Sequence, residues 1–146
     1  AQGCRVVLNS RHADELATSV ASLTGSVGVV GDMSNPLDAR RVVHDAETEW
    51  GALDIIVCNV GSGRSVAPGQ ETFEEWQRVF AANLWSTTNT VEAARATLAA
   101  SRGVVVCVSS ICGLEVVPAC LCAGHGATAR SSGCPYQCRG TWQYFV

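Results

Sequence analysis

Two adjacent hydroxyl side chains, Ser109 and Ser110, directly follow the apolar run 104–108. The run is short and consists mostly of valine, which predicts a strand buried on both faces rather than a helix. Ligands of open α/β sheets bind beyond the carboxyl ends of the strands. We therefore expect Ser110 to lie at a ligand-binding edge, where its hydroxyl is available for chemistry.

Three earlier apolar runs end in the same way, with polar residues or glycine. A guanidinium such as that of Arg11 can pair with a phosphate, and Gly61 lets the backbone approach a ligand closely. Asn59 can hydrogen-bond across neighbouring strands. The predicted strands and the groups that follow them are 4–9 with Ser10 and Arg11, 27–31 with Asp32, and 53–58 with Asn59 and Gly61.

Helical patterns fill the segments between these strands. Residues 12–24 carry apolar residues at helical spacing, and Asn35 with Pro36 predicts the start of a helix that Gly51 ends. Thr72 with Glu75 forms a capping box at the start of a long helical region that continues, with a break, to about residue 100. Strict alternation of strand and helix implies an α/β fold with right-handed crossovers, and we expect one parallel sheet containing all four strands.

The overall composition narrows the class of protein. The chain has 146 residues, of which 47% are hydrophobic and 16% charged, and its net charge is −3, as expected for one globular domain. The arginines are scattered, which argues against a nucleic-acid surface. Neither a bilayer-spanning apolar run nor a signal peptide is evident, so we expect a cytoplasmic protein without a membrane partner.

Residues 1 to about 118 resemble the short-chain dehydrogenase/reductase family, whose members have a Rossmann fold and use NAD or NADP. Residues 3–11 resemble the family's second strand and its adenosine-ribose loop. Members that prefer NAD usually place an acid near the position of Ser10, whereas here Arg11 follows, so the resemblance implies NADP rather than NAD. Asp32 resembles the acid that contacts the adenine amine. Taken alone, Arg11 is equally well a solvated residue at the start of a helix. Asp32 is alternatively an acid near a helix N-terminus, where it interacts favourably with the helix dipole.

The resemblance extends to the catalytic segments. Residues 58–61, Cys-Asn-Val-Gly, are similar to the family's Asn-Asn-Ala-Gly motif, with Asn59 and Gly61 matching. Asn83 matches an asparagine that bends a helix and holds a water of the proton relay, and Ser110 matches the serine that polarises the substrate carbonyl. The implied substrate is a small carbonyl compound or alcohol. Alternatively, Asn83 is a polar residue on a wet helix face, and the serine pair merely ends a strand.

Two parts of the family pattern are missing from the printed sequence. The opening strand and its Gly-rich turn would precede residue 1. The Tyr-x-x-x-Lys motif, whose tyrosine supplies a proton to the carbonyl, should follow Ser110, but residues 119–128 contain neither residue type and the chain has no lysine. We therefore expect an incomplete Rossmann-like doubly wound sheet and a truncated or inactive copy of the oxidoreductase. The resemblance is compatible with a homo-oligomer, without defining one.

The segment 119–146 shows no sustained period and reads as an irregular tail. One hypothesis is that it is an out-of-frame translation, which the coding DNA would decide. The chain has eight cysteines, and we expect those at 4, 58 and 107 to be buried as small hydrophobes. The alternative function is a non-catalytic nucleotide-binding module or a zinc module, the latter with ligands from Cys120, Cys122, His125, Cys134 and Cys138, although their spacing is unusual and we expect no metal site.

Overall fold

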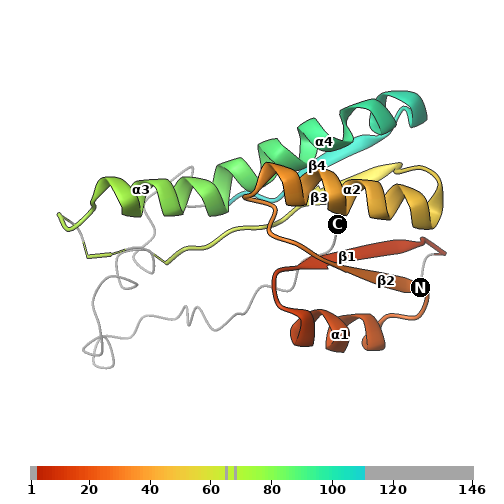
Figure 1. The fold of residues 1–146 in the computed structure, drawn as a ribbon, viewed down its shortest axis with the longest axis horizontal. Coiled ribbons are helices and arrows are strands. Elements are labelled where there is room, and N and C mark those ends of the chain that lie inside the picture. Colours follow the sequence, from red (N-terminus) through yellow and green to blue (C-terminus); the bar gives the residue numbers. More distant parts are fainter. Residues whose placement is uncertain (1–2, 65, 68, 111–146) are drawn as a thin grey trace.

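The computed structural model describes residues 3–64, 66–67 and 69–110. Strands and helices alternate along this part of the chain, with a π-helical segment between two of the helices (Figure 1). The alternating order predicted from the sequence is therefore confirmed. The elements are β1 (Val6–Ser10), α1 (Ala13–Ser22), β2 (Ser26–Val30), α2 (Pro36–Trp50), β3 (Ile55–Cys58), α3 (Phe73–Phe80), η1 (Ala81–Trp85), α4 (Ser86–Ser101) and β4 (Val104–Cys107).

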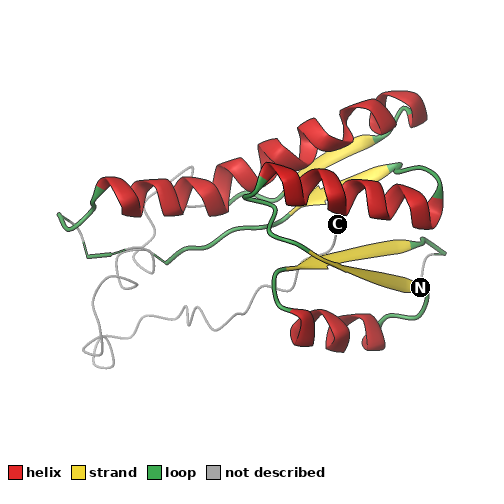
Figure 2. Ribbon diagram, viewed as in Figure 1, coloured by secondary structure: helices red, strands yellow, loops and turns green. Residues whose placement is uncertain are grey.

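The strands form two separate parallel pairs. β1 pairs with β2, from Val6 opposite Ser26 to Ser10 opposite Val30, and β3 pairs with β4. All four strands point the same way, and a gap separates the two pairs (Figure 2). The expectation of one continuous sheet was wrong. The physical reason is that β1 and β3 share no backbone hydrogen bonds, and no strand among the described residues joins the two pairs.

The predicted helix boundaries rest on local chemistry that the structure contains. The side chain of Asn35 accepts a hydrogen bond from the backbone N–H of Leu37 at 2.9 Å, and Pro36 occupies the first turn of α2. Gly51 ends the same helix with a φ of 86°, a conformation that favours glycine. At the start of α3, the side chain of Thr72 accepts from the backbone N–H of Glu75. These three signals are confirmed.

Helix α2 provides the packing that joins the two strand pairs. Val42 belongs to a buried cluster with Met33 and Ala39, next to β2. Its neighbour Val43 belongs to a second buried cluster that includes Ile56 of β3. Adjacent residues of one helix therefore reach two different cores, and α2 lies against both strand pairs (Figure 1).

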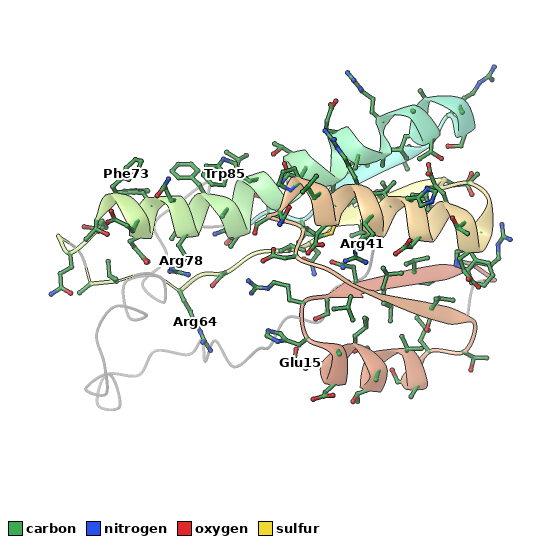
Figure 3. All side chains as sticks on the ribbon, viewed as in Figure 1. Glu15, Arg41, Arg64, Phe73, Arg78 and Trp85 are labelled. Carbon is green, nitrogen blue, oxygen red and sulfur yellow. The ribbon has the colours of Figure 1, made fainter. Side chains whose placement is uncertain are left out.

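Two apolar surfaces are more exposed than the sequence pattern suggests. The side of β4 is open, with Val104 54% and Val106 46% exposed, so the prediction of a strand buried on both faces was wrong. Helix α3 and segment η1 also expose large apolar side chains, namely Phe73, Trp76, Phe80, Leu84 and Trp85. Figure 3 shows Phe73 and Trp85 pointing away from the strands. In the part of the chain that the structure describes, α4 packs on β3 and β4 from one side, which leaves these residues without a covering layer.

The connection between α4 and β4 has no room for a side chain at Gly103. A Cβ there would lie 2.6 Å from the backbone oxygen of Asp54 and 2.7 Å from a methyl group of Leu98. We predict that Gly103→Ala lowers the free energy of unfolding by about 1–3 kcal/mol, because the backbone must shift to relieve the overlap. Denaturant unfolding followed by circular dichroism measures this change.

Gly63→Ala is the matched control, since a Cβ at that position meets nothing within 4 Å. It should leave stability unchanged or raise it slightly by restricting the unfolded chain. Equal stability of the two variants would contradict the close contact between Gly103 and the backbone of Asp54, just before β3.

Candidate functional site

The carboxyl ends of β1 and β2 bring together three of the predicted binding residues. The backbone oxygen of Ser10 accepts from the N–H of Gly31 at 3.1 Å, so the two strands end side by side. A guanidinium nitrogen of Arg11 lies 3.9 Å from a carboxylate oxygen of Asp32, and the Arg11 side chain is 62% exposed. This contact is long and solvated, so much of the guanidinium remains accessible to an anionic ligand.

The carboxylate of Asp32 is oriented by the turn that follows it. Its Oδ1 accepts from both the N–H and the hydroxyl of Ser34, at 2.9 and 2.7 Å. The N–H of Asp32 in turn donates to the carboxylate of Asp38, and this hydrogen bond, followed by one from Arg41, lowers the pKa of Asp38. Arg41 also donates to the backbone oxygen of Val30 at 2.7 Å, and it points from α2 toward the strand pair (Figure 3). The edge at Asp32 is thus held by α2.

Asn9 is a residue at this edge that the sequence reasoning missed. It is buried, and its side-chain nitrogen donates to the backbone oxygens of Val29 at 2.9 Å and Gly31 at 3.1 Å. Both acceptors belong to the neighbouring strand or to the residue that follows it. Asn9 therefore fixes the distance between β1 and β2 just before Ser10 and Asp32. An asparagine within an otherwise apolar buried strand was the signal available in the sequence, because a buried amide needs partners.

A second edge is formed by the ends of β3 and β4. The backbone N–H of Val108 donates to the oxygen of Cys58 at 2.9 Å, which extends the pairing to the residue before Asn59. Asn59 and Ser110 therefore follow adjacent parallel strands at one edge, as predicted. Ser110 is exposed and Asn59 is half-buried.

Asn83 lies in η1 and holds the loop that follows β3. Its side-chain oxygen accepts from the N–H of Ser62 at 2.8 Å, and its side-chain nitrogen donates to the oxygen of Ser62 at 3.1 Å and of Val79 at 2.9 Å. A Cβ added to Gly61 would lie 3.0 Å from the Asn83 oxygen, so the loop and helix approach closely there. The helix break expected in this region is a π-helical segment, a distortion frequent at functional sites.

The reciprocal bonds between Asn83 and Ser62 lead to a prediction. Asn83→Ala removes the side-chain partners of the Ser62 N–H and C=O, so the loop should open more readily. We expect hydrogen-exchange protection of the Ser62 amide to fall at least about tenfold. The free energy of unfolding should fall by about 0.5–1.5 kcal/mol, because the lost hydrogen bonds are exposed to water.

Ser62→Ala serves as its control, because the bonds to Asn83 use the Ser62 backbone alone. Within the described residues, the Ser62 hydroxyl accepts a hydrogen bond from the backbone N–H of Arg64 and makes none to Asn83. Similar loss of protection in both variants would mean that Asn83 does not hold the loop.

A small cavity lies behind this edge, with a volume of about 10 Å³, room for no more than one water. It is lined mainly by apolar and hydroxyl side chains. Burial, together with the neighbouring Cys107, raises the pKa of the Cys58 thiol in its wall to about 11, so that thiol stays protonated near neutral pH. The lining residues are Met33, Val57, Cys58, Val60, Ser86, Thr87 and Thr90.

The cysteines differ from their predicted burial. Cys58 is buried as expected, but Cys4 and Cys107 are exposed, so those two predictions were wrong. Cys4 precedes the first residue of β1, and Cys107 lies on the open strand β4. The five residues of the zinc hypothesis, like the predicted tail, lie outside the described residues.

The described segments contain neither a cluster of metal-binding side chains nor a helix able to span a membrane. Across residues 3–64, 66–67 and 69–110, no three His, Cys, Asp or Glu side chains gather closely enough to bind a metal ion. None of the helices within those same segments has the length and apolar character needed to cross a bilayer.

The alternating order, parallel pairing and polar strand ends define a Rossmann-like α/β domain. The family model described as Enoyl-(Acyl carrier protein) reductase matches residues 1–126. A Streptomyces violaceoruber protein named as ketoacyl reductase 2 of granaticin polyketide synthase is 38% identical over 118 residues, covering 77% of this chain and 47% of its own length. An Arabidopsis thaliana 11-beta-hydroxysteroid dehydrogenase, 1A, is 33% identical over 115 residues, covering 75% and 33%. The chain belongs to the short-chain dehydrogenase/reductase family.

Solved structures agree on the fold. The crystal structure of gox2181 superposes with a TM-score of 0.75 at 22% identity, covering 82% of this chain and 50% of that one. A Pseudomonas aeruginosa RhlG/NADP complex gives a TM-score of 0.69 at 23% identity, covering 79% and 48%. A Thermococcus sibiricus alcohol dehydrogenase complexed with 5-hydroxy-NADP gives 0.70 at 19%, covering 76% and 49%. The chain spans half or less of the length of these relatives and structures.

Proposed function

We propose that this chain binds NADP in preference to NAD through the edge formed by β1 and β2. The observation that carries the proposal is the exposed guanidinium of Arg11 beside Asp32, at the ends of two adjacent parallel strands. A guanidinium in this position can pair with the 2′-phosphate that distinguishes NADP. An acidic side chain in place of Ser10 would repel that phosphate. Two similar solved structures are named as complexes with 5-hydroxy-NADP and with NADP, which supports this assignment.

The donor set fits the adenosine end of such a cofactor. Arg11 offers a largely exposed guanidinium, and Asp32 offers an acceptor whose orientation Ser34 fixes. In this assignment Asp32 accepts from the adenine amine, and the Ser10 region faces the ribose. Asn59 and Gly61 lie at the neighbouring edge, where the loop held by Asn83 comes closest to the helix and would meet the rest of the nucleotide.

Ser110 is the proposed substrate-binding residue. Its exposed position beyond β4 suits a hydroxyl that donates to a substrate carbonyl, while the bound nicotinamide would supply hydride. The names of the relatives, a ketoacyl reductase and a hydroxysteroid dehydrogenase, support a carbonyl or alcohol substrate. Asn83 is assigned to the proton relay as a positioning residue, since its own amide is occupied by Ser62 and Val79.

Proton delivery is the missing step. The printed sequence has no lysine, and Tyr136 and Tyr144 do not stand four residues before one. Without a tyrosine acid and its lysine, reduction of a carbonyl would lack the proton that its oxygen must receive. We therefore propose that the 146-residue chain binds the nucleotide but does not turn over.

Calorimetric titration with NADP and NAD, followed by a carbonyl-dependent NADPH oxidation assay, tests both parts. The expected result is binding of NADP that is at least about tenfold tighter than that of NAD, with no carbonyl-dependent oxidation. Failure to bind either nucleotide would overturn the binding assignment. Turnover would show instead that a working reductase is present.

Arg11→Ala tests the residue that selects the phosphate. We predict that it weakens NADP binding about ten- to a hundredfold and leaves NAD binding nearly unchanged, because only NADP carries the 2′-phosphate. The matched control is Arg95→Ala, since Arg95 is 75% exposed on α4 and, among the described residues, forms an ion pair with Glu92 on its own helix. An equal loss of both nucleotides in Arg11→Ala would assign Arg11 to the fold rather than to phosphate selection.

A further inference from the structure

Two cysteines face each other across β3 and β4. The parallel register places Cys58 directly opposite Cys107, the last residue of each strand. Both residues are free thiols, and Cys107 is near enough to Cys58 to contribute to the raised pKa of the Cys58 thiol. Neither residue belongs to the proposed nucleotide site, although both immediately precede its second edge.

The backbone spacing suits a covalent link between them. Neighbouring strands lie about 4.8 Å apart, and paired residues project to the same face of a sheet. Disulfides span Cα separations of about 4.4–6.8 Å, so directly paired residues fall within this range. The link needs a rotation of the side chains rather than a movement of the strands.

The two thiols differ in access. Cys58 is only 6% exposed, in the cluster with Val43 and Ala94, and its thiol is held protonated. Cys107 is exposed on the open side of β4. An oxidant from solvent therefore reaches Cys107 first, and the buried Cys58 is the neighbouring thiol that can react with the oxidised Cys107.

We propose that Cys58 and Cys107 form a reversible disulfide in response to a hydroperoxide. The Cys107 thiol loses its proton and its sulfur attacks the peroxide. The O–O bond breaks, a sulfenic acid forms, and the leaving hydroxide or alkoxide takes up that proton and departs as water or alcohol. The sulfur of Cys58 then attacks the sulfenic sulfur, losing its proton as the S–O bond breaks and a second water leaves. Two thiols are oxidised by two electrons and one peroxide is reduced, and a dithiol reductant reverses the reaction.

The disulfide would act on the second edge without depending on nucleotide binding. It would join β3 to β4 one residue before Asn59 and three before Ser110. The two strands that lead to these residues would then be held together by a covalent bond as well as by backbone hydrogen bonds. The proposal stands whether or not the chain binds NADP.

Peptide mapping after peroxide treatment tests the pairing. The folded 146-residue chain is exposed to hydrogen peroxide, its remaining thiols are alkylated, and the digest is analysed by mass spectrometry. The expected product is a peptide pair linking Cys58 to Cys107, lighter by two hydrogens and lost on reduction with dithiothreitol. The same treatment in guanidinium chloride should lose this preference, because the chain order alone does not bring the residues together.

Single variants separate the roles of the two thiols. In Cys58→Ala, Cys107 should accumulate as a sulfenic acid that dimedone captures, at least about tenfold above wild type, because its partner is missing. In Cys107→Ala, Cys58 should remain a thiol. Cys4→Ala is the matched control for an exposed cysteine outside the pair and should leave the Cys58–Cys107 product unchanged.

Three results would overturn the proposal. A folded wild-type chain whose Cys58 and Cys107 both stay alkylatable after peroxide would show that the pair does not oxidise. Linkage of Cys107 to Cys112 or another cysteine in place of Cys58 would assign a different partner. Equal yield of the Cys58–Cys107 peptide in folded and denatured chains would remove the role of the strand register.

Discussion

The packing of two adjacent valines on α2 supports the rest of the described structure. Val42 is buried against Met33 beside one strand pair, and Val43 is buried against Ile56 in the other. The space at Val42 is filled so closely that a Cβ on Gly31 would lie 2.5 Å from its methyl group. Since β1 and β3 share no backbone hydrogen bonds, this apolar contact, and not a continuous sheet, sets the relation between the pairs.

Polar contacts add to this arrangement at the ends of the strands. The side chain of Asn89 on α4 donates to the backbone oxygens of Met33 and Ser34, at 3.1 and 3.0 Å. It therefore ties the helix above β3 and β4 to the turn that follows β2. Through this turn the orientation of Asp32 depends on α4 as well as on α2. The two strand edges therefore share their supporting helices.

The sequence predicts best those features whose cause is local. The starts of α2 and α3 follow from Asn35 and Thr72, whose side chains cap the next backbone groups, and the end of α2 follows from Gly51. The order of strands and helices along the chain follows from the alternation of short apolar runs with helical patterns. The polar residues that end the strands are read directly from the sequence. Burial was predicted less well: the apolar run of β4 and the thiol of Cys107 are exposed because burial depends on what packs over a segment. The clamps made by Asn9 and Asn83 join distant residues and show in the sequence only as asparagines in unusual places.

Different elements build the two strand edges of this chain. The β1–β2 edge depends on Asn9, Arg11 and Asp32, and its contacts to α2 and α4 do not pass through Ser110. The serine edge depends instead on β3, β4 and the loop held by Asn83. A change after Ser110 therefore removes none of these contacts of the first edge. The β1–β2 edge can keep its geometry independently of the residues that follow Ser110, because separate elements build the two edges.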